Sequence, residues 1–566
     1  MLQSGMPLSQ LCLRCGLSFE ISDHHLQFLE RAAPRACGQV LTYDRPRYCP
    51  SCRDQGRLAW RNDRSLYARE CGLCKKRVIS CYSPVSGITV YCSSCWNSDA
   101  WNPLDYGRDY DPRRPFLEQF SELLRTIPHL ALYNLNHENS EYCNHAADMK
   151  DSYLVFASAI NEKTMYATRT WKNVNCVDIV ESGENESCYS ILDCHNCYQL
   201  SSSLHCTHCA DSAFLFDCHS CRSCFGSANL RQAQYIYFNR QLTKAEYLNE
   251  IARLDLSSFD QRSLIAAKVD QHWGLQVHRH AFLTGCEGCN GDQLDRSKDS
   301  TYCFNLSEAH DCHYCELGFS PKDSYDASGI SAGELCYGVM NHLGSNRVCS
   351  GVVTYYNDSC HYSYHCQSCK DSIGAVGLRH QQYVILNKRY PRDEYEQLLL
   401  QICTQMRTDR SWGEFFPGEI SPFGYNETEA QSVFPLNEIL AQDQGFRWSE
   451  CSVPTPAARA VVAAKDLPDR ITEVTDEVLD WAIHEKQGSR PFKIMKSELT
   501  FYRNYALPLP HLHPDDRYHE LLRKRNPRRL FERTCNLCKA PLMSTYHAED
   551  PRIIACEACY NREVFG

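Results

Sequence analysis

Residues 188–224 read CYSILDCHNCYQLSSSLHCTHCADSAFLFDCHSCRSC, and this stretch decides the fold. CxxC pairs recur within it every twelve residues. From Cys176 onward, every third position is small or apolar, apart from one asparagine. A period of three fits neither an α-helix nor a flat strand. It predicts a narrow solenoid whose stacked coils point small side chains inward.

A second copy of this region follows along the chain. NLRQAQYIYFNRQLTKAEY (229–247) aligns with GLRHQQYVILNKRYPRDEY (377–395) at an offset of 148. The period-three register recurs less regularly between Cys303 and Cys369, where Cys349 is out of phase. We expect each copy to end with a strand, YIYFN or YVILN, and then a helix that begins near TKAEY or PRDEY.

The cysteines of this middle region allow three interpretations. Free cysteine packs as a small hydrophobe and is among the most buried residue types, which suits a period-three ladder. Some pairs, such as Cys194 and Cys197 with Cys206 and Cys209, could instead bind metal. Redox disulfides are the third interpretation.

Twelve other cysteines have the spacing of zinc ribbons. Two sites each have CxxC pairs separated by seventeen residues, within the range of about 15–20 typical of four-cysteine zinc sites. A CxxC turn directs two thiolates at one tetrahedral ion, and a hairpin returns the second pair. A third site has a longer spacer of 33 residues. Loose thiols, a redox pair or separate knuckles are the alternatives. The predicted ligands are Cys12, Cys15, Cys49 and Cys52; Cys71, Cys74, Cys92 and Cys95; and Cys535, Cys538, Cys556 and Cys559. We expect about three Zn²⁺ per chain.

The two short-spacer ribbons belong to a duplicated module. RNDRSLYARECGLC (61–74) matches RNPRRLFERTCNLC (525–538) at an offset of 464. Upstream, FEISDHHLQFL (19–29) resembles FKIMKSELTFY (492–502) at a different offset. The C-terminal copy has HPDD (513–516) near the place of the N-terminal CPSC. We therefore expect that the later copy has lost one metal.

The predicted fold is mixed and β-rich. Terminal zinc ribbons flank a duplicated, β-solenoid-like, cysteine-rich middle, and a mainly helical segment precedes the C-terminal ribbon. Before the middle, an amphipathic helix places Phe116, Phe120 and Leu123 on its core face. Helix is also expected at ITEVTDEVLDWAIHEK (471–486). The predicted domains are an N-terminal double zinc-ribbon module (1–100), a linker and helix (101–135), two solenoid repeats (136–250 and 251–396), a mainly helical segment (397–490) and a C-terminal zinc-ribbon module (491–566).

Composition and charge bound the function. The chain has 566 residues and 36 cysteines, which is too long for a disulfide mini-protein. Its net charge of −10 argues against a protein that binds polyanions over its whole surface. The stretch MLQSGMPLSQLCLRCG has no basic or apolar signal region, and no run of eighteen apolar residues exists. We therefore expect a cytoplasmic protein with reduced thiols and no membrane contact.

Basic side chains gather beside two of the ribbons, most densely in RKRNPRRLFER (523–533). Such residues beside aromatic side chains suit phosphate contacts and base stacking. The alternatives are a solvated face or an intramolecular acidic partner. HLH (511–513) and His519 are weaker ligand candidates, since surface or hydrogen-bonded histidines are more common. The candidate nucleic-acid-binding residues are Arg523, Lys524, Arg525, Arg528, Arg529, Arg61 and Arg64.

Several specific segments carry a resemblance to a known family. They are CLRCG (12–16), CPSCR (49–53), RNDRSLYARECGLC (61–74), SCYSP (80–84), YGRDYDPRRPFLEQF (106–120), FGSANLRQAQY (225–235) and RNPRRLFERTCNLC (525–538). On these residues the chain resembles the cysteine-rich multi-zinc-ribbon proteins of environmental bacteria with small genomes. The resemblance covers nearly the whole chain but implies no particular activity. The sequence departs in the complete ligand set of its second N-terminal ribbon, where many relatives are expected to lack some cysteines.

The sequence therefore predicts a zinc-binding scaffold that contacts nucleic acid, RNA or a ribonucleoprotein, through its basic zinc-ribbon modules. A protein–protein scaffold without nucleic acid is the first alternative. A metal or thiol redox enzyme is the second, and it would need an open coordination position or a thiol of low pKa. No HExxH or Walker A motif is present, so an enzyme is the less favoured class.

Overall fold

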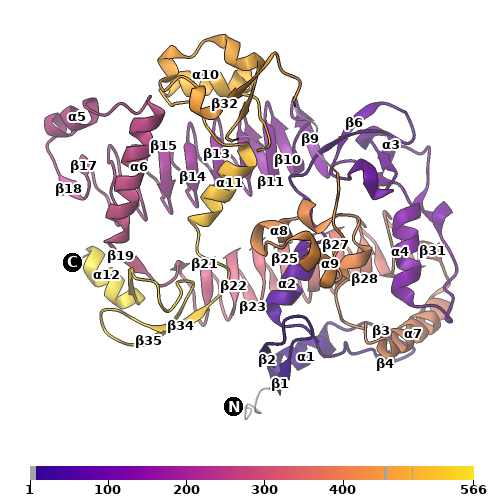
Figure 1. Ribbon diagram of the computed structural model, residues 1–566. Coiled ribbons are helices and arrows are strands. Elements are labelled where there is room, and N and C mark those ends of the chain that lie inside the picture. The colour runs from indigo at the N-terminus through magenta and orange to yellow at the C-terminus, as the bar shows by residue number, and fades with distance from the viewer. Residues whose placement is uncertain (1–7, 452–455, 487–488, 566) are drawn as a thin grey trace. The chain divides into compact units, whose positions relative to one another are not determined.

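The computed structural model describes residues 8–451, 456–486 and 489–565 (Figure 1). The first seven residues of MLQSGMPLSQLCLRCG lie outside the described residues. The chain divides into two compact units. The described residues of unit 1 are 8–132, 281–451 and 528–530, and those of unit 2 are 133–280, 456–486, 489–527 and 531–565. Unit 1 thus combines the N-terminal module with the second solenoid repeat, and unit 2 combines the first repeat with the C-terminal module.

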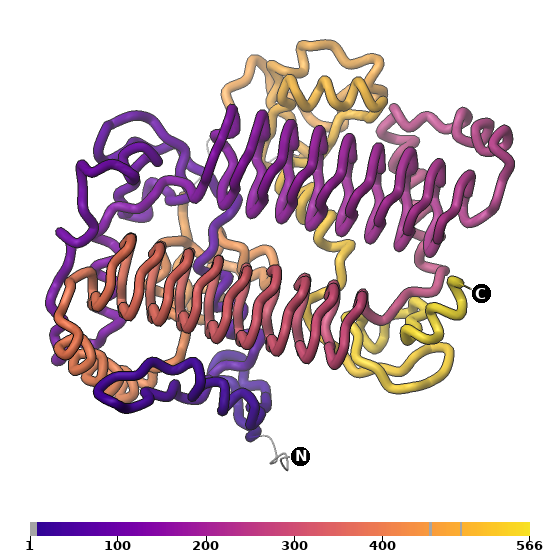
Figure 2. The backbone as a smooth tube through the Cα atoms, turned by 180° about the vertical axis from the view of Figure 1, so that it is seen from behind, coloured from indigo at the N-terminus to yellow at the C-terminus, as the bar shows by residue number. Residues whose placement is uncertain are grey.

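The first repeat forms a β-solenoid in unit 2, visible as a row of stacked coils in Figure 2. Its parallel strands pair at a spacing of twelve residues, as Val177 with Tyr189 shows. The sheet contains β9 (Asn134–Glu138), β10 (Asn144–Lys150), β11 (Tyr153–Glu162), β12 (Met165–Thr168), β13 (Val177–Val180), β14 (Tyr189–Leu192), β15 (Tyr198–Leu204) and β16 (Ala210–Ala213).

The second repeat forms a solenoid of the same kind in unit 1, with a 12-stranded sheet. Tyr325 pairs with Tyr337, again twelve residues apart. The strands are β20 (Leu283–Thr284), β21 (Gly291–Asp295), β22 (Cys303–Ser307), β23 (His310–His313), β24 (Glu316–Phe319), β25 (Lys322–Ser331), β26 (Tyr337–Leu343), β27 (Cys349–Tyr355), β28 (Asp358–Tyr364), β29 (Lys370–Ile373), β30 (Gln382–Ile385) and β31 (Lys388–Arg389). The predicted duplicated β-solenoid is therefore confirmed.

The backbone explains the period of three. The residue before nearly every inward position has a positive φ, for example Asn175 (54°) and Asp178 (55°). The chain therefore turns every third residue, and a coil of twelve has four short sides. A left-handed conformation disfavours a non-glycine residue by about 1–2 kcal/mol. Backbone hydrogen bonds between coils oppose this strain, such as Val177 N–H to Cys188 O at 3.0 Å.

The interior cysteines line the axis of each solenoid. Cys194, Cys206 and Cys218 are fully buried in the core of unit 2. Their thiols donate weakly to backbone carbonyls, as Cys194 Sγ does to Ser203 O at 3.5 Å. A small side chain with a weak donor suits this narrow interior, in agreement with the packing interpretation.

A helix follows each solenoid where the sequence predicts one, and unit 2 has a further helix that was not predicted. After β17 (Ile236–Tyr237) and β18 (Arg240–Gln241), helices α5 (Lys244–Ala252) and α6 (Phe259–Gly274) continue unit 2. After β31, α7 (Arg392–Thr408) continues unit 1. In unit 1, helix α4 (Phe116–Thr126) buries Phe116, Phe120 and Leu123 completely, as its pattern predicts.

The residues between α7 and the C-terminal module contain short elements. In unit 1, the elements of this segment are the 3₁₀ turns η3 (Gly418–Ile420) and η4 (Tyr425–Glu427) and the helices α8 (Glu429–Val433) and α9 (Glu438–Asp443). Unit 2 adds β32 (Ala460–Ala463), η5 (Ala464–Asp466), η6 (Ile471–Glu473), η7 (Asp476–Asp480) and β33 (Trp481–His484). The predicted helix at 471–486 is wrong. Two 3₁₀ turns and β33 replace it, because β33 pairs with β32 in parallel and a helix would break this pairing.

Candidate metal centres

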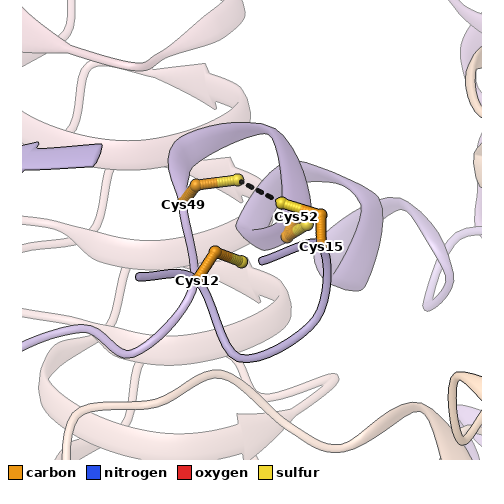
Figure 3. Close-up of side chains that lie close together, drawn as sticks. All are labelled: Cys12, Cys15, Cys49 and Cys52. Atoms are coloured by element: carbon orange, nitrogen blue, oxygen red, sulfur yellow. Dashed lines mark hydrogen bonds between the residues drawn. The ribbon is translucent and has the colours of Figure 1, made fainter. Parts of the chain in front are cut away.

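The first predicted tetrad lies in unit 1. Cys12 and Cys15 come from the turn between β1 (Leu8–Leu11) and β2 (Ser18–Ile21), and Cys49 and Cys52 come from the start of α2 (Pro50–Leu58). The four side chains converge, as Figure 3 shows, and their sulfur atoms all lie within 4.8 Å of one another. The long spacer holds α1 (Asp23–Arg31), β3 (Arg35–Ala36) and β4 (Gln39–Val40), so it does not prevent the two knuckles from meeting.

The other two tetrads are built alike. In unit 1, Cys71 and Cys74 lie at the turn between β5 (Tyr67–Glu70) and β6 (Arg77–Ser80), and the second pair surrounds the start of α3 (Ser93–Trp96). In unit 2, the third tetrad joins the turn between β34 (Phe531–Thr534) and β35 (Pro541–Ser544) to the start of α12 (Glu557–Phe565). Lys75 (φ 63°) and Lys539 (φ 64°) complete the two knuckle turns at matching positions. The structure therefore brings together all twelve predicted ligands in three groups of four.

The sulfur–sulfur distances fit a shared tetrahedral ion. Cys15 Sγ lies 3.7 Å from Cys49 Sγ, Cys74 Sγ lies 3.8 Å from Cys92 Sγ, and Cys538 Sγ lies 3.7 Å from Cys556 Sγ. A disulfide needs about 2.05 Å between sulfurs. Two sulfurs bound at ~2.3 Å to one tetrahedral ion would lie about 3.8 Å apart. The three tetrads could thus each hold one metal ion through four sulfurs.

One thiol in each tetrad has a pKa below the ordinary value for cysteine. A hydrogen bond with Cys52 lowers the pKa of Cys49 to about 5. Burial acts to raise the pKa of Cys71 and of Cys535, but backbone N–H groups outweigh it and lower both values to about 6. The N–H of Cys92 donates to Cys71 Sγ at 3.3 Å, and that of Cys556 donates to Cys535 Sγ at 3.3 Å. Since the thiolate is the metal-binding form, these N–H groups favour binding.

The interior cysteines of the solenoids are arranged differently. All 36 cysteines are free of disulfides. Among the described residues, no interior cysteine belongs to a group of three or more potential ligand atoms within 4.8 Å of one another. The solenoid rows therefore differ from the terminal tetrads in geometry as well as in sequence.

The candidate basic residues differ in how deeply they are buried. Arg61 donates to the buried Asp63 at 2.9 Å. In unit 2, Arg525 pairs with Glu181, and its side chain is 12% exposed. In unit 1, Arg528 pairs with Glu316 and is 6% exposed. These three side chains have an acidic partner within the protein, which was the alternative to nucleic-acid binding. Of the others, Arg64 is half-buried, Arg523 and Arg529 are exposed, and the exposed Lys524 lies 3.9 Å from Asp270 Oδ1.

Two of the weaker histidine candidates, His511 and His513, have structural roles in unit 2. His513 accepts a hydrogen bond from Asp515 N–H and caps α11 (Pro514–Arg523). His511 stacks on Phe259, with ring centroids 3.4 Å apart. Neither belongs to a cluster of potential metal ligands within the described parts of the chain.

One sequence pattern typical of hydrolases occurs in unit 1, the GxSxG match GISAG (329–333). Its serine, Ser331, ends β25 and pairs with Phe319 and Leu343 in the parallel ladder. A nucleophile elbow requires a strand, a sharp turn and a helix. The solenoid coil replaces that arrangement, so the match carries no catalytic assignment.

Comparisons with known proteins leave the assignment to the geometry. No protein-family model matches the chain, and no curated protein matches it. Among the described helices, none is both long enough and apolar enough to cross a bilayer.

Proposed function

We propose that this protein is a scaffold whose terminal modules are stabilised by structural zinc. The closed geometry of the tetrads carries the proposal, because four sulfurs around one point leave no position for a substrate. Catalytic zinc sites instead keep a fourth position for water. The cysteines of each tetrad lie in a turn and at the start of a helix, and folding brings them together. An ion bound there would therefore stabilise the folded module and not the unfolded chain.

Zinc is the metal we propose, although four thiolates also suit iron. Zinc has no redox chemistry and accepts tetrahedral geometry without preference, which suits a structural role. The thiols must stay reduced to bind it, which supports a cytoplasmic location.

Metal counting tests this proposal. Native mass spectrometry and elemental analysis of reduced protein should find three zinc ions in closed thiolate sites. The change Cys535→Ser should remove one ion, whereas Cys37→Ser, at an exposed cysteine outside the tetrads, should remove none. Strong chelators should unfold the terminal modules and leave the solenoids folded. Iron in place of zinc, or an unchanged count in Cys535→Ser, would contradict the proposal.

The partner we propose is nucleic acid, RNA or a ribonucleoprotein. The exposed side chains of Arg523 and Lys524, at the end of α11 and close in sequence to the C-terminal ribbon, support it. Lys524 lies 3.9 Å from Asp270 Oδ1, but both side chains are exposed, and such a surface ion pair is weak. Arg525 and Arg528 are engaged in ion pairs and are less suited to bind phosphate. A protein partner is the alternative.

A salt titration with single-stranded RNA separates these partners. Binding should weaken as salt rises, and Arg523→Gln with Lys524→Gln should reduce the salt dependence by about one unit per lost phosphate contact. The control, Arg240→Gln with Lys244→Gln, removes the same charge from exposed positions after the first solenoid. Absence of binding at roughly 50 mM salt, where phosphate contacts are strong, would leave a protein as the partner.

A further inference from the structure

Three side chains of unit 1 form a fourth group of potential metal ligands, separate from the tetrads. His24 lies in the first turn of α1, and Asp311 and His313 lie on β23 of the second solenoid. One ligand atom from each lies within 4.8 Å of the others. The group therefore joins the N-terminal module to the solenoid within the same unit.

Each imidazole has one nitrogen held by a hydroxyl group. His24 Nδ1 lies 2.5 Å from the hydroxyl of Tyr325, and His313 Nδ1 lies 2.5 Å from Oγ1 of Thr301. Both Nε2 atoms face the same carboxylate oxygen, Asp311 Oδ1, at 3.4 Å and 3.5 Å. Metal-binding histidines are typically held in this way, with the second ring nitrogen hydrogen-bonded to fix the ring.

The distances to Asp311 Oδ1 indicate the same chemistry. They exceed the usual hydrogen-bond range of about 2.7–3.2 Å. Two ligand atoms bound at ~2.1 Å to one tetrahedral ion would lie about 3.4 Å apart. His313 Nε2 is buried and has no hydrogen-bond partner. A buried ring nitrogen without a hydrogen bond is unfavourable, and a bound cation would satisfy it.

We propose that His24, Asp311 and His313 bind one divalent transition-metal ion through both Nε2 atoms and the carboxylate. Two nitrogens and one oxygen suit Zn²⁺, Fe²⁺, Co²⁺ or Ni²⁺. The side chains of His24 and Asp311 are 43% and 41% exposed, so the remaining coordination positions face solvent. This ion is accessible to water or a small anion, unlike an ion inside a closed tetrad, and it fastens α1 to the solenoid.

Unit 2 has the corresponding place without the ligands. In the alignment of 19–29 with 492–502, Ser497 corresponds to His24. At the offset of 148 between the solenoid repeats, Lys163 corresponds to Asp311 and Met165 to His313. Ser497 Oγ contacts Met165 Sδ at 3.2 Å. Helix α10 (Lys496–Asn504), which corresponds to α1, therefore approaches the equivalent face of the solenoid in unit 2. Docking alone therefore does not require histidine and aspartate here.

Metal titration of the full chain tests this site. Protein whose tetrads already hold metal is titrated with Zn²⁺, and bound ions are counted by native mass spectrometry. Co²⁺ is added in a parallel experiment, because its visible absorption distinguishes nitrogen and oxygen ligands from thiolates. We expect one additional ion per chain, with a cobalt spectrum that lacks intense thiolate bands.

Variants assign that ion to the three residues. His313→Gln, His24→Gln and Asp311→Asn should each lose the additional ion and retain the tetrad ions, which also shows that the modules remain folded. His310→Gln is the matched control, an exposed histidine beside Asp311 that is outside the group. The isosteric Asp311→Asn keeps the test valid if a histidine variant misfolds. Absence of an additional ion in the wild type, or its persistence in Asp311→Asn, would show an ordinary histidine–aspartate pair and overturn the proposal.

Discussion

The two units repeat one construction with different chemistry. In unit 1, β7 (Val90–Tyr91) pairs in parallel with β8 (His129–Leu130), and Tyr82 contacts His129 Nδ1 at 3.4 Å. In unit 2, β36 (Ile553–Ala555) pairs in parallel with β19 (Val277–Arg279), and Tyr546 contacts His278 Nδ1 at 3.4 Å. The ribbon of each unit is thus attached to a neighbouring strand, β8 or β19, by equivalent contacts.

A buried ion pair joins module and solenoid in both units. Arg53 Nε donates to Asp326 Oδ2 at 2.8 Å in unit 1. Arg517 lies 3.0 Å from Asp178 Oδ2 in unit 2, at the equivalent positions of both repeats. Arg517 also faces the buried Glu498 at 3.4 Å. Unit 2 therefore buries two carboxylates around one arginine.

The helix that contains each of these arginines begins differently in the two units. The N-cap of α2 is Cys49, a tetrad member whose side chain makes no capping hydrogen bond. The equivalent N-cap of α11 is His513, whose ring caps the helix. Asp515 in the first turn pairs with Arg490 at 2.8 Å. Acidic residues near a helix N-terminus are favourable, so a cap and an ion pair can stabilise the helix end that a cysteine tetrad occupies in unit 1.

Removing the central arginines should give the largest difference between the units. Arg517→Met should destabilise unit 2 by about 3–5 kcal/mol, because breaking a buried pair leaves charge without compensation. Arg53→Met should have a smaller effect in unit 1, because Arg57 also lies 3.5 Å from Asp326. Urea denaturation with hydrogen exchange, which resolves the two units, measures both losses. Neutralising Asp178 and Glu498 in the Arg517→Met background should restore part of the stability. Equal losses in the two units would contradict this reading.

The loss of stability at low pH should reveal the contribution of two equivalent buried histidines, His129 in unit 1 and His278 in unit 2. Burial lowers the pKa of His129 to about 4 and that of His278 to about 4. The neutral form is therefore favoured in the fold, and stability present above the unfolded pKa of about 6.5 is lost as pH falls towards 4. Each histidine should contribute about 3 kcal/mol of this loss.

The variant His129→Gln should flatten the pH dependence of unit 1 and leave that of unit 2 unchanged. Unfolding is measured by hydrogen exchange between pH 6.5 and pH 4. His380→Gln, at an exposed histidine of unit 1, is the control. If the stability of His129→Gln falls with pH as steeply as that of the wild type, another group dominates the pH dependence of unit 1.

The smallest effect concerns the corners of the solenoids. Gln199 (φ 48°) and Arg347 (φ 50°) occupy the same left-handed corner in units 2 and 1. Valine at either position should destabilise its unit by about 1–2 kcal/mol, because a β-branched side chain is strained there. Glycine at position 199 should be tolerated. Thermal unfolding measures the change, and unequal losses for the two valine variants would show that the coils differ in rigidity.

The sequence predicted much of this arrangement, but not its electrostatics. The rows of small residues and the CxxC spacing predicted the solenoids and the groups of four cysteines. The basic segment 523–533 suggested a charged surface, yet Arg525 and Arg528 lie against glutamates that are distant in sequence. The helix expected at 471–486 was wrong because β32 pairs with β33. His24 carried no signal as a ligand, since Asp311 and His313 lie on another element.

By itself, the sequence determined the features that depend on local repetition. A turn every third residue requires small inward side chains at that period, and a knuckle requires two cysteines three positions apart. Only the tertiary structure decided that the N-terminal module packs in one unit with the second solenoid, that particular arginines are buried, and that His24 meets Asp311 and His313. These outcomes depend on contacts between distant segments, and distance along the chain leaves no periodic pattern from which to predict them.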